Sequence, residues 1–99
     1  MKMRSEKAIE NDVKRYIENQ GGWWIKIQGG SNNPSVGVPD LLACINGRFV
    51  AIELKRSSGG VVSEIQKEQI RRIKNSGGVA FVASDVGTVR MELERAKII

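Results

Sequence analysis

The sequence contains no histidine and a single cysteine, Cys44. The lack of histidine excludes a Ser-His-Asp triad, a Cys-His pair and histidine-bound zinc, and one cysteine builds neither an intrachain disulfide nor a thiolate zinc site. Any metal ion bound here must therefore take carboxylate, carbonyl and water ligands. Mg²⁺ and Mn²⁺ are the ions that prefer such ligands.

Long apolar segments are also lacking, since no run approaches the roughly 20 residues of a membrane helix. The first seven positions are charged and lead into no apolar stretch, which predicts no signal peptide. Together with the shortage of cysteine, these absences predict a cytoplasmic protein without membrane contact. The length of 99 residues predicts one domain, spanning 1–99.

Positive charge is present in excess. The net charge is +5 and the isoelectric point about 9.7, which favours an anionic partner, and nucleic acid is the first candidate. Many small basic proteins bind no nucleic acid, so the charge alone does not decide the function.

The spacing of apolar residues predicts an α/β fold. Ile9, Val13, Tyr16 and Ile17 form one stripe of a first helix that Ser5 would cap. The expected order is helix, three strands, helix, strand and helix, with a mixed sheet flanked by helices and a central antiparallel hairpin. Helices are expected at 5–19, at 63–76 and from 85 onward, and strands at 23–28, 38–45, 49–55 and 79–83.

Two carboxylates lie in segments that are otherwise apolar. Glu53 falls in strand 49–55, which we expect to be covered on both faces, and Asp40 follows Pro39 in strand 38–45. A two-residue Asn46-Gly47 turn pairs the strands so that Asp40 lies opposite Glu53, roughly 5 Å away. A divalent cation would turn their repulsion into a binding site. The alternatives are a structural Glu53–Lys55 ion pair and a turn role for Asp40.

The Pro39-Asp40 pair, followed by Glu53-Leu54-Lys55, resembles the PD-(D/E)xK nuclease superfamily. The surrounding stretches 37–42, 47–49 and 52–55, with Gln66 before Gly77, are similar to the VRR-NUC family of virus-type replication-repair nucleases, in a stand-alone phage or prophage form. The resemblance implies a restriction-endonuclease-like core and a Mg²⁺- or Mn²⁺-dependent DNA endonuclease with no other small-molecule cofactor.

The same resemblance implies roles for particular residues. Asp40, Glu53 and the backbone carbonyl of Leu54 would hold the metal, and Lys55 would lie beside the attacking water. A glutamate of the first helix would lie near the metal. We expect Glu6 rather than Glu10, because Glu6 falls inside the apolar stripe and Glu10 at its edge. The alternative for Glu6 is a capping or solvated side chain.

Gln66 has two interpretations. With Ser63 it matches a capping box at the start of a helix. It also projects along the apolar stripe of that helix, toward the sheet, where a buried amide needs a partner and the site carboxylates could supply one. We expect a role for Gln66 in the site.

The expected partner is DNA, branched or duplex. By analogy with small resolvase-like members of the superfamily, we expect a homodimer that cuts four-way junctions. A non-catalytic DNA-binding module and a nuclease for single strands or RNA are the alternatives. Either tryptophan, Trp23 or Trp24, could stack on bases, and at least one should be core. The residues expected to contact DNA, each of which could instead be merely solvated, are Lys26, Arg48, Arg56 and, in the loop 29–37, Ser31 and Asn32.

Overall fold

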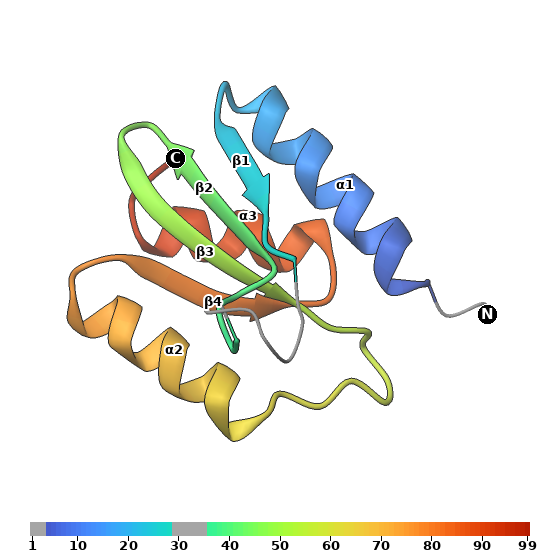
Figure 1. Ribbon diagram of the computed structural model, residues 1–99. Helices are drawn as coiled ribbons and strands as arrows, with labels where there is room; N and C mark the ends of the chain where they lie inside the picture. Colours follow the sequence, from blue (N-terminus) through green and yellow to red (C-terminus); the bar gives the residue numbers. More distant parts are fainter. Residues whose placement is uncertain (1–3, 29–35) are drawn as a thin grey trace.

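The structure, a computed structural model, describes residues 4–28 and 36–99 (Figure 1). A four-stranded sheet with the order β1-β2-β3-β4 lies between helices. The order of elements along the chain confirms the predicted α/β fold. The elements are α1 (Glu6–Asn19), β1 (Trp23–Lys26), β2 (Leu41–Ile45), β3 (Arg48–Leu54), α2 (Glu64–Asn75), β4 (Val79–Ala83) and α3 (Val86–Arg95).

The central hairpin has the predicted register. Strands β2 and β3 are antiparallel, with Ile45 opposite Arg48 and Leu41 opposite Ile52. The turn residues Asn46 and Gly47 have φ values of 50° and 77°, which is the backbone conformation of a tight two-residue hairpin turn. Strand β1 pairs with β2 in the antiparallel sense, and α2 carries the chain across to β4, which is parallel to β3.

The helix starts follow the capping rules. Ser5 Oγ accepts a hydrogen bond from the Ala8 amide, and Asp85 Oδ1 accepts one from Thr88. The strands differ slightly from their predicted bounds: β2 begins at Leu41 rather than at position 38. Pro39 has no amide hydrogen to donate to a neighbouring strand, which explains the late start.

One face of the sheet carries the core. Helices α1 and α3 cover this face, and Val13, Ile17, Val89 and Leu93 are fully buried between them and the strands (Figure 1). The sheet residues buried in the same cluster are Leu41, Ala43, Ile45, Val50, Ile52, Leu54, Phe81 and Ala83.

The other face is covered only in part. Helix α2 packs over β4, and Ala51 and Glu53 of β3 are buried on this side. Phe49, at the start of the same strand, remains 47% exposed, so the expectation that strand 49–55 is covered on both faces holds for its second half alone. Among the described residues, no helix is long and apolar enough to cross a membrane.

Candidate active site

Asp40 is fixed between two strands at the end of the sheet. Its backbone carbonyl accepts a hydrogen bond from the Ile27 amide at 2.8 Å. Its carboxylate oxygen Oδ2 accepts one from the backbone amide of Leu54, also at 2.8 Å. Because the register of β2 and β3 continues past Leu41, Asp40 lies opposite Glu53, as the sequence predicts.

Glu53 is the most buried acidic side chain of the described residues, with 1% of its surface exposed. Its Oε2 accepts a hydrogen bond from Gln66 Nε2 at 2.9 Å and lies 3.2 Å from Lys55 Nζ. Its Oε1 is buried without a hydrogen-bond partner. Burial, followed by the negative charge of Asp40, raises the pKa of Glu53 to about 7, although Lys55 acts in the opposite direction.

Gln66 fulfils both interpretations of the sequence. Its side-chain oxygen accepts a hydrogen bond from the Ser63 amide at 2.9 Å, and Ser63 Oγ accepts one from the Gln66 amide, which completes a capping box. The side-chain nitrogen of Gln66 remains available and donates to Glu53. The start of α2 is thereby tied to the carboxylate on β3.

This donor set suits a hard divalent cation. A buried carboxylate oxygen without a donor needs a partner, and a metal ion would supply one to Glu53 Oε1. Within residues 4–28 and 36–99, no group of three or more acidic or cysteine side chains could hold a metal. The available ligands are Asp40, Glu53 and a backbone carbonyl, and Mg²⁺ is commonly bound by one or two carboxylates with waters completing its shell.

A cavity of about 290 Å³ opens beside Asp40, between α1 and the ends of β1 and β3. It places residues of α1 beside Asp40. Its lining residues are Glu6, Lys7, Glu10, Lys26, Asp40 and Leu54.

The two glutamates of α1 are placed differently from the helical-wheel expectation. Glu6 is exposed at the rim of the cavity, whereas Glu10 is only 5% exposed. The Glu10 carboxylate binds Lys14 and Lys26 at 2.7 Å and Lys7 at 3.2 Å. Burial would raise the pKa of Glu10, but hydrogen bonds from these lysines outweigh it and lower the pKa to about 2. The role of Glu6 stays a prediction.

We expect the change Glu10→Ala to lower the free energy of unfolding by about 1–2 kcal/mol, because it leaves Lys14 and Lys26 close together without their shared anion. Urea denaturation of the metal-free protein measures this loss. The matched control is Glu64→Ala, whose carboxylate is 90% exposed and pairs with Lys67, and which should cost under about 0.5 kcal/mol. Equal losses for both variants would contradict a structural role for the lysine cluster.

The expected DNA contacts fall into three groups. Lys26 lines the cavity beside Asp40, and Arg56 is exposed just after Lys55. Arg48 lies at the hairpin turn, at the opposite end of β3 from Glu53, where it donates to the Ala96 carbonyl at 3.5 Å. The structure therefore does not bring Arg48 to the site. Ser31 and Asn32 lie outside the described residues.

The two tryptophans differ in their exposure, and two lysines lie near Trp24 or Glu10. Trp24 packs against the core and donates through Nε1 to Glu18, and Lys14 Nζ lies 4.5 Å from the centre of its ring. Trp23 is 60% exposed. The sequence reasoning did not place Lys7 and Lys14 beside Glu10. The available signal was their position three residues before and four residues after Glu10, the spacing of helical ion pairs.

Comparisons with known proteins agree with this geometry. The family model described as archaeal Holliday junction resolvase (Hjc) matches residues 1–98. A solved structure described as a VRR_NUC domain is 23% identical, with a TM-score of 0.74, and the match covers 90% of this chain and 94% of that one. A search of curated proteins gave no significant match.

A second solved structure is Hjc of Archaeoglobus fulgidus, a Holliday junction resolvase from an archaeal hyperthermophile. It is 26% identical with a TM-score of 0.59, and the match covers 78% of this chain and 65% of that one. The predicted resemblance to VRR-NUC domains within the PD-(D/E)xK superfamily is confirmed. The phage or prophage assignment stays a prediction.

Proposed function

Because the chain belongs to the archaeal Holliday junction resolvase family, we propose that it is a metal-dependent endonuclease that cuts branched DNA such as four-way junctions. The observation that carries this proposal is the buried Glu53 carboxylate, which lies opposite Asp40, binds Lys55 and keeps one oxygen without a partner. Such a cluster is costly to bury and has a clear use only when a cation and a substrate complete it.

Each residue of the cluster has a proposed task. Asp40, Glu53 and the Leu54 carbonyl would hold Mg²⁺ or Mn²⁺, an ion that supplies a Lewis acid for the phosphate and lowers the pKa of a bound water. Lys55 orients the attacking water or stabilises the negative charge that develops on the phosphate. Gln66 keeps the Glu53 carboxylate in place through its side-chain nitrogen. The expected products carry 5′-phosphate and 3′-hydroxyl ends, and 3′-phosphate or cyclic phosphate ends would contradict this chemistry.

The positive charge serves substrate binding in this proposal. Lys26 and Arg56 are near enough to the site to bind phosphates beside the scissile bond. Arg48 would contact DNA further from the site, at the hairpin turn, and contacts from Ser31 and Asn32 stay predictions. We propose that the enzyme acts as a homodimer in the cytoplasm, presenting two sites to two strands.

The test is cleavage of a labelled four-way junction, compared with linear duplex and single strands of the same sequence, in Mg²⁺, Mn²⁺ or EDTA. We expect cutting of the junction in either metal, none in EDTA, and slower cutting of the linear duplex. Binding of the junction without cutting in both metals would contradict the enzyme and support a DNA-binding module. Faster cutting of single strands or RNA would contradict the branched substrate.

A further inference from the structure

Positive charge without a paired carboxylate gathers at one end of the sheet. Among residues 4–28 and 36–99, each arginine or lysine makes a salt bridge to a carboxylate except Arg48, Arg56, Arg72, Lys74 and Lys97. Arg56 follows Lys55 beside the proposed active site. The other four lie near the opposite end, where the hairpin turns and where α2 and α3 end (Figure 1).

Contacts between the ends of these elements bring the basic side chains together. Arg48, the first residue of β3, donates to the Ala96 carbonyl at 3.5 Å, and Ala96 directly precedes Lys97. Lys74 and Arg95 line the same cavity of about 330 Å³, to which Ala96 also contributes. The residues Arg48, Lys74, Arg95 and Lys97 are called the turn-end surface below.

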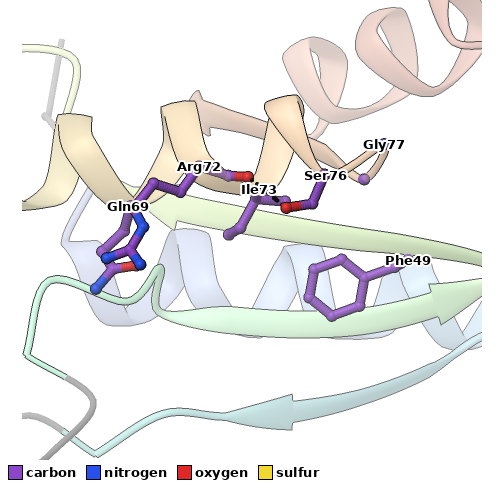
Figure 2. A pocket seen from close by; sticks show the side chains of 7 residues that line it. Phe49, Gln69, Arg72, Ile73, Ser76 and Gly77 are labelled. Carbon is purple, nitrogen blue, oxygen red and sulfur yellow. Dashed lines mark hydrogen bonds between the residues drawn. The ribbon is translucent and has the colours of Figure 1, made fainter.

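Arg72 extends the positive charge to the adjacent face of the sheet. It lines a cavity of about 510 Å³ between α2 and the start of β3, and Figure 2 shows it on the helix, across from Phe49 on the strand. Phe49 directly follows Arg48. Glu68 acts on Arg72 electrostatically but forms its salt bridge with Arg71. Arg72 therefore has no salt-bridge partner of its own in the part of the chain that the structure describes.

The turn-end surface stays positive on balance. Glu92 lines the same cavity as Lys74 and pairs with Arg95 at 3.5 Å, whereas Arg48, Lys74 and Lys97 have no such partner among the described residues. Helix ends carry a partial negative charge that favours basic residues in the last turn, which gives Lys74 and Arg95 a structural use. Arg48 lies on a strand, so this use does not apply to it.

Lys97 has a backbone conformation that favours a different residue. Its φ is 60°, in the left-handed region where glycine is the usual residue after a helix. Its amide donates to the Glu94 carbonyl and the amide of Ile98 to the Leu93 carbonyl, a helix end that glycine would form at lower cost. The lysine side chain at this position therefore has a use outside the fold, and an anionic ligand fits its chemistry.

We propose that the turn-end surface binds the phosphate backbone of the DNA substrate at a distance from the bond that is cut. The DNA substrate comes from the proposed function, on which this inference rests. Arg48 precedes Glu53 on β3 by five residues, which corresponds to ~17 Å along the strand. Phosphates of one DNA strand follow each other at about 3.4 Å along the helix axis, so a duplex arm that follows β3 meets the surface about five base pairs from the cut.

A contact of this kind sets the direction of a duplex arm. Phosphate contacts fix the register and orientation of DNA on a protein, and two contacts that lie apart define a direction that one contact at the cut does not define. Phosphate contacts carry no sequence information, so we expect the surface to bind linear duplex and the arm of a four-way junction alike.

The first test measures the affinity for a four-way junction in EDTA at several salt concentrations. The triple variant Arg48→Gln/Lys74→Gln/Lys97→Gly removes the unpaired cations of the turn-end surface. Each lost phosphate contact lowers the slope of log affinity against log salt concentration by about 0.9. We expect a slope lower by about two to three and, at about 0.1 M salt, binding weaker by at least about tenfold.

The matched control is Arg15→Gln/Arg71→Gln/Arg90→Gln, which has the same net charge as the first variant. These three side chains are 62–72% exposed, pair with carboxylates and lie outside the turn-end surface. We expect the control to lower the slope by less than about one. Urea denaturation of both variants shows whether they are folded and as stable as the wild type.

Hydroxyl-radical footprinting on the junction locates the contact. We expect the wild type and the control to protect the DNA backbone about five base pairs from the cut. The turn-end variant should lose this protection and keep the protection at the cut. A footprint that is the same for the wild type and the turn-end variant would overturn the proposed contact.

Equal affinities and salt slopes for the two triple variants would also overturn the inference, as would a loss of stability without a loss of affinity. A larger loss of affinity for RNA of the same sequence than for the junction would exclude DNA as the ligand of this surface. None of these measurements needs cutting. A protein that binds DNA through the turn-end surface and cuts nothing would contradict the nuclease alone, and one that cuts with unchanged affinity in the turn-end variant would contradict this inference alone.

Discussion

The variant Lys55→Ala is expected to cut the four-way junction about 10²–10⁴-fold more slowly than the wild type in saturating Mg²⁺. The ammonium group of Lys55 lies 3.2 Å from Glu53, and the proposed function gives it the task of orienting the attacking water or stabilising charge on the phosphate. In the proposed chemistry, this substitution removes a donor that acts mainly in the transition state. Single-turnover cleavage of labelled DNA measures the rate, and the junction should bind nearly as tightly as before.

Two controls make this expectation specific. Lys67→Ala removes an equal charge from an exposed position on α2, where Lys67 pairs with Glu64, and should cut like the wild type. Lys55→Arg keeps the charge but changes the shape of the donor and should stay impaired. If Lys55→Ala cuts at a rate within about tenfold of the wild-type rate, Lys55 has no part in the proposed chemistry.

The stability of the metal-free protein is expected to fall as the pH rises from about 5 to about 8. The pKa of Glu53 is raised from its ordinary value of 4.5 to about 7 by burial and by Asp40, so the folded protein keeps a proton that the unfolded chain has lost. Stability decreases wherever the folded state binds more protons, and the loss is complete above the folded pKa. Because solvent partly screens the charges at this end of the sheet, the expected loss in the free energy of unfolding is on the order of 2 kcal/mol.

Glu53→Gln isolates this effect. An amide has the shape of the protonated carboxyl and does not ionise, so the variant should show a flatter pH dependence and be more stable than the wild type at pH 8 in EDTA. It should also lose metal-dependent cutting. Added Mg²⁺ should raise the melting temperature of the wild type but not that of Glu53→Gln. Equal slopes of stability against pH in both proteins would show that Glu53 titrates normally.

The hairpin was predictable because its determinants are local. Asn46 and Gly47 demand a tight turn, and once the turn is fixed the register follows, which sets Asp40 opposite Glu53. Both contacts of Gln66, with Ser63 and with Glu53, were also predictable, because a capping box and a position on the inner face of a helix are both sequence patterns. Its catalytic contribution, like that of Lys55, stays a prediction.

Other features depend on contacts between distant segments. A helical wheel places residues around an axis but does not say where the neighbouring strand lies. Glu10 is buried because Lys26, on β1, approaches it from outside the helix. The exposure of Phe49 arises in the same way: its strand is apolar on both faces, and only the position of α2 over β4 reveals which part of the second face is covered.

The hydrogen bond between the Leu54 amide and Asp40 explains a freedom in the Glu-x-Lys sequence. Position 54 acts through main-chain atoms: its N–H donates to Asp40, and its carbonyl is a proposed ligand of the ion. Its side chain faces the opposite way and is 1% exposed in the core. One branched aliphatic residue can therefore replace another at this position if it fits the core, because the main-chain groups that serve the site do not change. Proline is the exception, because it lacks the amide hydrogen that Leu54 donates to the Asp40 carboxylate.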